Sequence, residues 1–217
     1  MKPYYQDSSV TIYHGDCREI VPSLGRFDLL LTDPPYGIGA LMKGGTWGGS
    51  QKYDKMRELD TSAPSLDFLI ALGIPSIIWG GNYFGLPPSR CWLSWSKINV
   101  VPTMASMELA WTNLDKPAKE FRAPVGVHDL GHPTQKPESL MQWCLGIAGE
   151  SAGVILDPFA GSGTTGRAAK DLGRKAVLIE QEEAYCEIAA RRMCQEVFDF
   201  GYSTTPAETA CLPDVSG

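Results

Sequence analysis

Four consecutive residues, Asp33-Pro34-Pro35-Tyr36, combine groups that can activate a poorly nucleophilic amino group. The lone pair of an amino group on a base is delocalised into the ring. Two acceptors on its N–H bonds, the carboxylate of Asp33 and the carbonyl of Pro34, favour a nucleophilic geometry and stabilise the charge that develops on nitrogen. Consecutive prolines fix φ and remove N–H donors, so that carbonyl is rigidly aimed. Tyr36 offers a ring on which a flipped-out base can stack. The alternative interpretation is an ordinary turn at a strand end.

A second segment combines glycines with a helix start. It consists of Asp157, Pro158, Phe159, Ala160, Gly161, Ser162, Gly163, Thr164 and Thr165. Glycines let the backbone approach a ligand closely, and a helix start offers free N–H groups. A phosphate-binding P-loop is excluded because Gly-Lys-Ser/Thr is missing. Glu180 follows one predicted strand later, where an acid can accept hydrogen bonds from ribose hydroxyls. The glycine segment and Glu180 together indicate a site for an adenosine-containing cofactor.

Alternating strands and helices must position these residues. Short apolar runs predict seven strands, at 10–14, 27–32, 76–79, 91–96, 108–112, 154–156 and 176–179, and the fourth and fifth can pair as a hairpin-like element. Helical spacing predicts helices at 66–72, 137–148, 164–172 and 182–197. This alternation is typical of an α/β fold with an open, doubly wound, mostly parallel sheet. The Gly80-Gly81-Asn82 stretch after the third run either lines a target-base site or packs at a helix start.

The chain resembles the amino-methylating DNA methyltransferases of the adenine-N6 and cytosine-N4 type. Their catalytic motif has the form (D/N/S)-P-P-(Y/F/W), and their cofactor motif is similar to Phe159-x-Gly161-x-Gly163. A third signature of the family matches His132-Pro133-Thr134-Gln135-Lys136-Pro137. The catalytic motif precedes the cofactor motif, as in the β subgroup, and the resemblance covers roughly residues 10–193.

This resemblance implies a seven-stranded Rossmann-like methyltransferase sheet with one antiparallel strand and S-adenosyl-L-methionine as methyl donor. It adds His132, Thr134 and Lys136 to the cofactor pocket, with Lys136 as the partner of the methionine carboxylate. Because the motifs are permuted, the third cofactor strand is the N-terminal run at 10–14. That order places Asp16 beside the cofactor's adenine, with Cys17 next to it. It also brings Asp33 within reach of the cofactor. The alternative interpretation of Asp16 is a polar turn at a strand end.

The substrate expected from the resemblance is adenine N6 in double-stranded DNA, because aspartate before Pro-Pro is typical of the adenine members. Cytosine N4 is the first alternative. An RNA guanine-N2 methyltransferase shares both motifs but normally places the cofactor motif first. The alternative of another class is a DNA-binding homologue that has lost catalysis, against which the intact catalytic motif argues.

Composition limits these expectations without overturning them. The net charge is −6 and the pI about 5.1, which is acidic for a nucleic-acid binder. Phosphate contact needs only local charge, and two basic clusters offer it: Lys43, Lys52, Lys55 and Arg57, then Lys116, Lys119 and Arg122. The six cysteines and three histidines show no metal-ligand spacing, so we expect no metal site. The scattered cysteines are typical of reduced thiols in a cytoplasmic protein. No apolar run is long enough to span a membrane, so we expect no membrane segment.

The length of 217 residues fits one domain. We expect a methyltransferase domain at 1–200 and a flexible tail at 201–217. The domain contains a loop at 37–63 that is either a mobile functional segment, and then a candidate for DNA contact, or disordered. Between the catalytic and cofactor motifs, little besides this loop and residues 114–130 remains for target recognition. Either the recognised sequence is short or a homodimer partner contributes. This lean organisation resembles stand-alone methyltransferases of phages.

Overall fold

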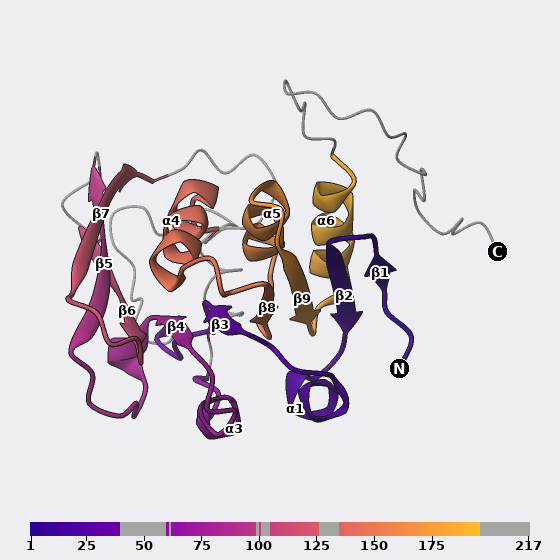
Figure 1. Cartoon of the computed structure of the whole chain (residues 1–217), viewed down its shortest axis with the longest axis horizontal. Helices are drawn as coiled ribbons and strands as arrows, with labels where there is room; N and C mark the ends of the chain where they lie inside the picture. The colour runs from indigo at the N-terminus through magenta and orange to yellow at the C-terminus, as the bar shows by residue number, and fades with distance from the viewer. Residues whose placement is uncertain (40–59, 61, 99, 101–104, 126–134, 196–217) are drawn as a thin grey trace.

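The computed structural model describes residues 1–39, 60, 62–98, 100, 105–125 and 135–195, which form one nine-stranded sheet (Figure 1). The strand order across the sheet is β1-β2-β9-β8-β3-β4-β6-β5-β7. The strands are β1 (Tyr5–Gln6), β2 (Val10–His14), β3 (Leu29–Thr32), β4 (Ser76–Trp79), β5 (Cys91–Ile98), β6 (Met107–Thr112), β7 (Lys119–Pro124), β8 (Val154–Asp157) and β9 (Lys175–Glu180).

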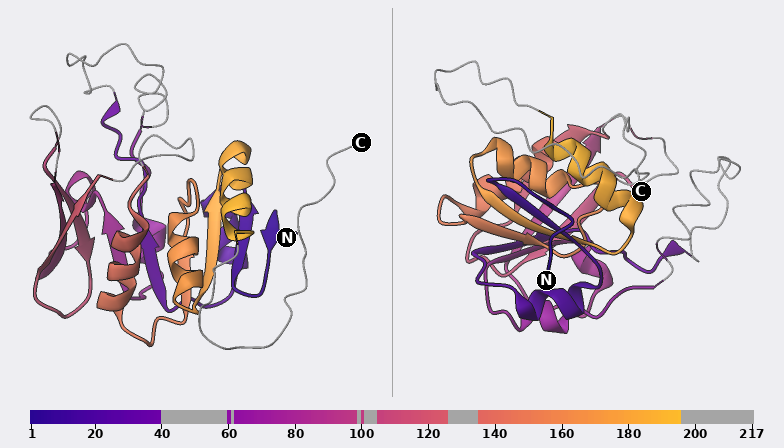
Figure 2. Two further views of the ribbon diagram at one scale, coloured as in Figure 1. Left: turned by 90° about the horizontal axis from the view of Figure 1, so that it is seen from above. Right: turned by 90° about the vertical axis from the view of Figure 1, so that its right-hand side faces the viewer.

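Helices cover both faces of the sheet, as Figures 1 and 2 show. One face carries α4 (Glu138–Ala148), α5 (Thr164–Asp171) and α6 (Glu183–Met193), and the other carries the short helices α1 (Cys17–Ile20) and α3 (Asp67–Ile70). In the described part of the chain, a 3₁₀ turn follows α1, η1 (Val21–Ser23), and another follows β4, η3 (Gly81–Tyr83). Each face has its own buried apolar cluster, because central strands such as β3 and β4 are buried on both sides.

The seven predicted strands are all present, and β6 is the one among them that runs antiparallel to its neighbours β4 and β5. The expected number of strands was too low. The edge strands β1 and β7 were missed, and β1 is a second antiparallel strand. β1 has only two residues, and β7 alternates charged with apolar residues at the outer edge, so neither has the apolar run that identified the others.

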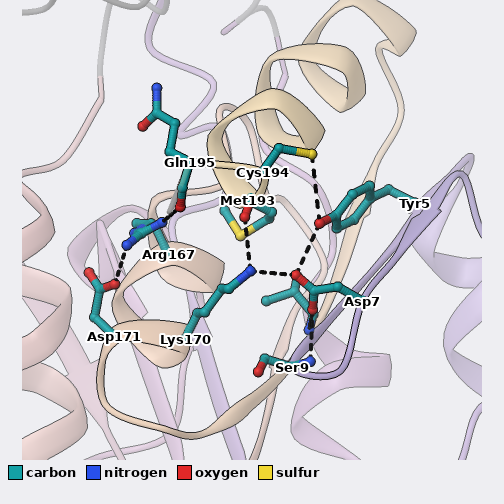
Figure 3. A network of polar contacts seen from close by, with 10 residues as sticks. Tyr5, Asp7, Ser9, Arg167, Lys170, Asp171, Met193, Cys194 and Gln195 are labelled. Carbon is teal, nitrogen blue, oxygen red and sulfur yellow. Dashed lines mark hydrogen bonds and ion pairs between the residues drawn. The ribbon is translucent and has the colours of Figure 1, made fainter. Parts of the chain in front are cut away.

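A polar network fixes the N-terminal edge of the sheet to the helices (Figure 3). Asp7 accepts hydrogen bonds from the backbone N–H groups of Ser9 and Val10, both at 2.7 Å, and so shapes the turn into β2. Its carboxylate also pairs at 2.6 Å with Lys170 of α5, whose ammonium donates to the carbonyl of Met193 at 2.9 Å. The first strands of the chain are thereby held against the two helices that follow the glycine segment.

The permuted motifs converge because parallel strands end at the same edge of the sheet. From the boundary between β8 and β3, the chain proceeds outward through β9 on one side and through β4 on the other. This boundary is the topological switch point, where open α/β sheets bind ligands. Asp33 follows β3, Asp157 ends β8 and Glu180 ends β9, so all three lie at this edge.

Parts of the expected organisation lie outside the described residues. These are most of the loop at 37–63, with the first basic cluster, and the whole tail at 201–217. Of the second basic cluster, Lys119 and Arg122 lie on β7. Among the residues that the structure describes, no helix is long and apolar enough to cross a membrane.

Candidate active site

The carboxylate of Asp33 is the centre of a small, half-buried polar cluster. The hydroxyl of Tyr36 donates to its Oδ1 at 2.6 Å, and the ammonium of Lys136 donates to its Oδ2 at 2.5 Å. Lys136 also donates to the Tyr36 hydroxyl at 3.1 Å. Pro34 is buried behind this cluster, and Pro35 is partly exposed. The catalytic motif predicted from the sequence is therefore assembled around one carboxylate whose two oxygens both have donors.

The ring of Tyr36 is held from several sides by residues that follow β4. It stacks on Tyr83, with ring centroids 4.9 Å apart and an interplanar angle of 19°, and meets Phe84 edge-on at 6.4 Å. Gly80 has a φ of +68°, and a Cβ there would lie 2.0 Å from Cε1 of Tyr36. A glycine is therefore required for this packing. The Gly80-Gly81 stretch borders the catalytic motif, and Tyr83 remains 47% exposed at its rim.

Lys136 belongs to the catalytic cluster in this structure. Its side chain is only 6% exposed, and its ammonium pairs with Glu108 Oε2 at 2.9 Å as well as with Asp33. Burial lowers the pKa of Lys136, but the charges of Asp33, Tyr36 and Glu108 outweigh that effect and raise it well above its usual value. The ammonium is therefore permanently charged at neutral pH. Its expected contact with a methionine carboxylate remains a prediction.

The rest of the third signature is only partly described. His132 and Thr134 lie outside the described residues. Gln135 lies next to the glycine segment: turned with its nitrogen toward Ser162 Oγ, its amide donates there at 3.2 Å and accepts from the buried Arg192 at 2.9 Å. Arg192 also donates to Thr164 Oγ1 at 3.1 Å. Sequence reasoning missed Arg192, because it lies on the otherwise apolar buried face of α6.

The glycine segment forms a tight cradle at the start of α5. Gly161 and Gly163 have φ values of +52° and +79°, and Gly163 is the N-cap of α5 without any side-chain cap. A Cβ at Gly163 would lie 2.9 Å from the Cβ of Ala189. Of the remaining members, Pro158, Phe159 and Ala160 lie in the turn between β8 and α5, and Thr165 lies in the first turn of α5; all except Phe159 are buried. Uncapped N–H groups at a helix start are suited to polar ligand oxygens.

Two carboxylates flank this cradle. Glu180 Oε2 accepts the N–H of Gly161 at 2.7 Å, and its Oε1 accepts the N–H of Glu182 at 2.8 Å. Each oxygen keeps a second lone pair for a ligand hydroxyl, and burial raises the pKa of Glu180. Asp157 is 3% exposed, and burial raises its pKa to about 6 against the lowering effect of hydrogen bonds from Thr165 and Thr32.

Asp16 and Cys17 lie one strand further along the same edge. β2 pairs with β9, with His14 opposite Glu180, and the N–H of Gly15 donates to the carbonyl of Glu180 at 2.9 Å. Asp16 is the N-cap of α1, and its carboxylate holds the guanidinium of Arg18 at 2.5 Å. Burial raises the pKa of the Cys17 thiol to about 11, so this thiol stays protonated and acts as a packing group. The expected adenine contact at Asp16 remains a prediction.

Glu108 and Lys97 complete the catalytic cluster, and the sequence did not single them out. Glu108 pairs with Lys97 through one oxygen and with Lys136 through the other. Burial raises the pKa of Glu108, but Lys136 and Lys97 outweigh it and lower this pKa to about 2. The one available signal was a charged residue at the start of an otherwise apolar run. Among the described residues, no group of three or more His, Cys, Asp or Glu side chains could hold a metal ion.

Comparisons with known proteins agree with this arrangement. The family model of DNA methylases of the N6/N4 type matches residues 78–191, which is more than half of the chain. The type II methyltransferase M.ScaI of Streptomyces caespitosus is 27% identical over 256 aligned residues, covering 88% of this chain and 84% of that protein. The type II methyltransferase M2.LlaDCHI of Lactococcus lactis subsp. cremoris is 25% identical, covering 88% and 92%.

Two solved structures share the fold. The complex of M1.HpyAVI with SAM has a TM-score of 0.56 at 24% identity, covering 85% of this chain and 98% of that one. The cytosine-N4-specific PvuII DNA methyltransferase has a TM-score of 0.60 at 16% identity, covering 88% of both chains. These two similarities concern the fold, that is, the arrangement of the sheet and its flanking helices.

Proposed function

This chain belongs to the N6/N4 family of DNA methylases, and we propose that it transfers a methyl group from S-adenosyl-L-methionine to the N6 amino group of adenine in double-stranded DNA. The observation that carries the proposal is the position of Asp33. Its carboxylate lies at the carboxyl edge of β3, next to β8 and the glycine cradle that follows it. An acceptor for an amino group and a cofactor cradle thus lie over adjacent strand ends.

The cradle fits the cofactor in shape and in polarity. The positive φ values at Gly161 and Gly163 form the sharp turn into α5, and the missing Cβ of Gly163 lets this turn pack closely against Ala189 of α6. The spare lone pairs of Glu180 suit the two ribose hydroxyls. When bound, S-adenosyl-L-methionine supplies an electrophilic methyl group on a sulfonium. Asp16 on the neighbouring strand end is the residue that we expect to accept from the adenine amino group of the cofactor.

The catalytic motif provides what the target base needs. The Asp33 carboxylate and the Pro34 carbonyl accept the two N–H bonds of the amino group, which favours the nucleophilic geometry and stabilises developing positive charge. Tyr36 offers its ring to the flipped base. The face of Tyr36 that Tyr83 now covers is the stacking surface beside the exposed rim, so Tyr83 must move aside or form the second wall when a base enters.

Adenine is the preferred base because an aspartate stands first in the catalytic motif. This choice comes from the family pattern, and the geometry around Asp33 suits the cytosine N4 amino group equally well. Product analysis distinguishes the two. Purified protein is incubated with unmethylated DNA and labelled S-adenosyl-L-methionine, and the digested nucleosides are identified by mass spectrometry. N6-methyladenine supports the proposal, and N4-methylcytosine corrects the base.

Asp33→Ala tests the catalytic assignment. The variant should lose methyl transfer by about three orders of magnitude or more, as expected for loss of a main transition-state acceptor, while it binds cofactor within about threefold of the parent. Asp28→Ala on the same segment is the matched control, because Asp28 only caps the start of β8 through the N–H groups of Gly153 and Val154. An active Asp33→Ala enzyme would refute the role. Label in RNA but not in DNA would move the activity to an RNA substrate.

Three further expectations, on domain organisation, oligomeric state and location, belong to this proposal. We place the catalytic domain at residues 1–200, with the loop at 37–63 as the DNA-contacting segment. A homodimer partner would supply part of the recognition surface that this short chain lacks. Light scattering with and without a DNA duplex measures the stoichiometry directly, and a monomer on DNA excludes the partner. We also place the enzyme in the cytoplasm of a bacterium or of a phage-infected host cell, where its DNA substrate lies.

A further inference from the structure

Lys136 is shared between two carboxylates at the place where the target amino group must bind. Its ammonium lies 2.5 Å from Asp33 Oδ2 and 2.9 Å from Glu108 Oε2. The hydroxyl of Tyr36 occupies the other oxygen of Asp33. Both oxygens of Asp33 therefore carry donors, and an incoming amino group has to displace one of them. Lys136 holds Oδ2 through a charged donor, whereas the donor from Tyr36 on Oδ1 is a neutral hydroxyl.

Glu108 is placed to receive the displaced ammonium. β6 runs antiparallel to β4 and β5, so its first residues lie at the edge of the sheet where the parallel strands end. Glu108 pairs with Trp95 in the ladder, and Leu109 accepts the N–H of Gly80 at 2.8 Å, next to the ring of Tyr36. This reversal of one strand brings an acid from the outer half of the sheet to the catalytic motif.

One oxygen of Glu108 has acceptor capacity to spare. Its Oε1 pairs with Lys97, whereas its buried Oε2 forms no properly aligned hydrogen bond within the described part of the chain, although Lys136 lies within ion-pair distance. A small shift of Lys136 from Asp33 toward Glu108 would satisfy that oxygen. The two negative charges of Asp33 and Glu108 also equal the two positive charges of Lys97 and Lys136. The cluster therefore stays neutral when Lys136 moves between the two carboxylates.

We propose that Glu108 is a positioning residue that takes Lys136 away from Asp33 when the target amino group binds, which frees Asp33 Oδ2 to accept an N–H of the base. This inference rests on the proposed function, because it assigns a target amino group to Asp33. It applies to an adenine or a cytosine amino group alike. Buried ion pairs of this kind are weak contributors to stability, so a role in the reaction accounts for the cluster better than folding does.

Two variants of the same cluster test the proposal with opposite expectations. Glu108→Gln removes the alternative partner of Lys136 and leaves the whole ammonium charge on Asp33. Lys97→Met removes the other partner of Glu108 and leaves Glu108 free to attract Lys136 more strongly. Single-turnover methyl transfer is measured with saturating cofactor and saturating DNA of the mapped recognition sequence. Cofactor Kd by calorimetry and thermal unfolding are recorded for each variant.

Glu108→Gln should transfer at least tenfold more slowly than the parent, with cofactor Kd unchanged within threefold. Lys97→Met should transfer at least threefold faster than the parent, because Glu108 then attracts Lys136 more strongly away from Asp33. A parental rate in Glu108→Gln would overturn the proposal. So would an equal loss in both variants, since that would assign the cluster to folding. An inactive parent contradicts the proposed function instead, and is thereby distinguished from a failure of this inference.

A measurement on the parent protein tests the proposal even if the variants do not fold. In a crystal structure with S-adenosylhomocysteine and a duplex of the mapped sequence, Lys136 should lie within 3.2 Å of Glu108 and more than 4 Å from Asp33. A ternary complex in which Lys136 still pairs with Asp33 at its present distance refutes the exchange of partners.

Discussion

Thr32 donates a hydrogen bond from its Oγ1 to Oδ1 of Asp157 at 2.7 Å, across 125 positions of sequence. Both side chains are buried, at 0% and 3% exposure. Thr32 directly precedes Asp33, the proposed catalytic residue, and Asp157 opens the glycine cradle. The bond joins the ends of the neighbouring strands β3 and β8, which pair in parallel. It therefore fixes the spacing between Asp33, the proposed acceptor for the base, and the glycine segment, the proposed cofactor cradle.

Thr32→Val should lower both stability and the rate of transfer. Valine keeps the shape of threonine but removes the hydroxyl, so the buried Asp157 carboxylate loses a donor. We expect a loss of about 1–3 kcal/mol in the free energy of unfolding, as for a hydrogen bond to a charged group. Urea unfolding measures it. Thr32→Ser keeps the hydroxyl and serves as the control; equal stability of the valine and serine variants would contradict the role of this bond.

Asp157→Asn should change how stability depends on pH. Burial raises the pKa of Asp157 to about 6 in the folded protein, above the usual value of 3.8. Because the pKa of Asp157 is raised in the folded protein, its protonated side chain stabilises the fold fully below about pH 4, and this stabilisation is lost as the pH rises through 6. A shift of about two units corresponds to roughly 3 kcal/mol. The free energy of unfolding of Asp157→Asn, relative to the parent, should therefore increase between pH 4 and pH 7. A constant difference over that window would contradict the assignment.

Glu180→Gln should weaken cofactor binding while the fold is kept. Both oxygens of Glu180 accept backbone N–H groups, from Gly161 and Glu182, and a glutamine offers only one oxygen. A charge-assisted hydrogen bond to a ribose hydroxyl is also lost, so we expect about a tenfold or larger increase in Kd. Calorimetric titration with S-adenosyl-L-methionine measures the change. Glu182→Gln is the neighbouring control, since the Glu182 side chain is exposed and caps no N–H group.

Gly80→Ala should disturb the catalytic motif specifically. The new Cβ would lie 2.0 Å from the ring of Tyr36, so the ring has to leave its place between Gly80 and Tyr83. We expect methyl transfer to fall at least tenfold with cofactor affinity unchanged. Gly73→Ala is the matched control: its φ of +65° carries the same backbone strain, but nothing lies within 4 Å of its Cβ. If both variants lose activity equally, the effect comes from backbone strain and not from Tyr36.

Local patterns in the sequence determined the elements and the three motifs. Runs of apolar residues identified the seven inner strands, because strands buried on both faces need them. The residue types of Asp33 to Tyr36 and of the glycine segment indicated their chemistry, because that chemistry depends on groups adjacent in the chain. The order of these motifs also placed the strand at 10–14 beside the cofactor half, which the pairing of β2 with β9 confirms.

Only the tertiary structure decided which distant side chains share the site. Glu108 reaches the catalytic motif on β6 and pairs there with Lys97 of β5, and nothing in the local sequence of either residue shows that the reversal of β6 brings Glu108 there. The structure also pairs Lys136 with Asp33 and Glu108, because burial leaves an ammonium no water and requires a carboxylate nearby; its contact with the cofactor stays a prediction. Residue type sets what each group can do; the folded sheet sets which groups meet.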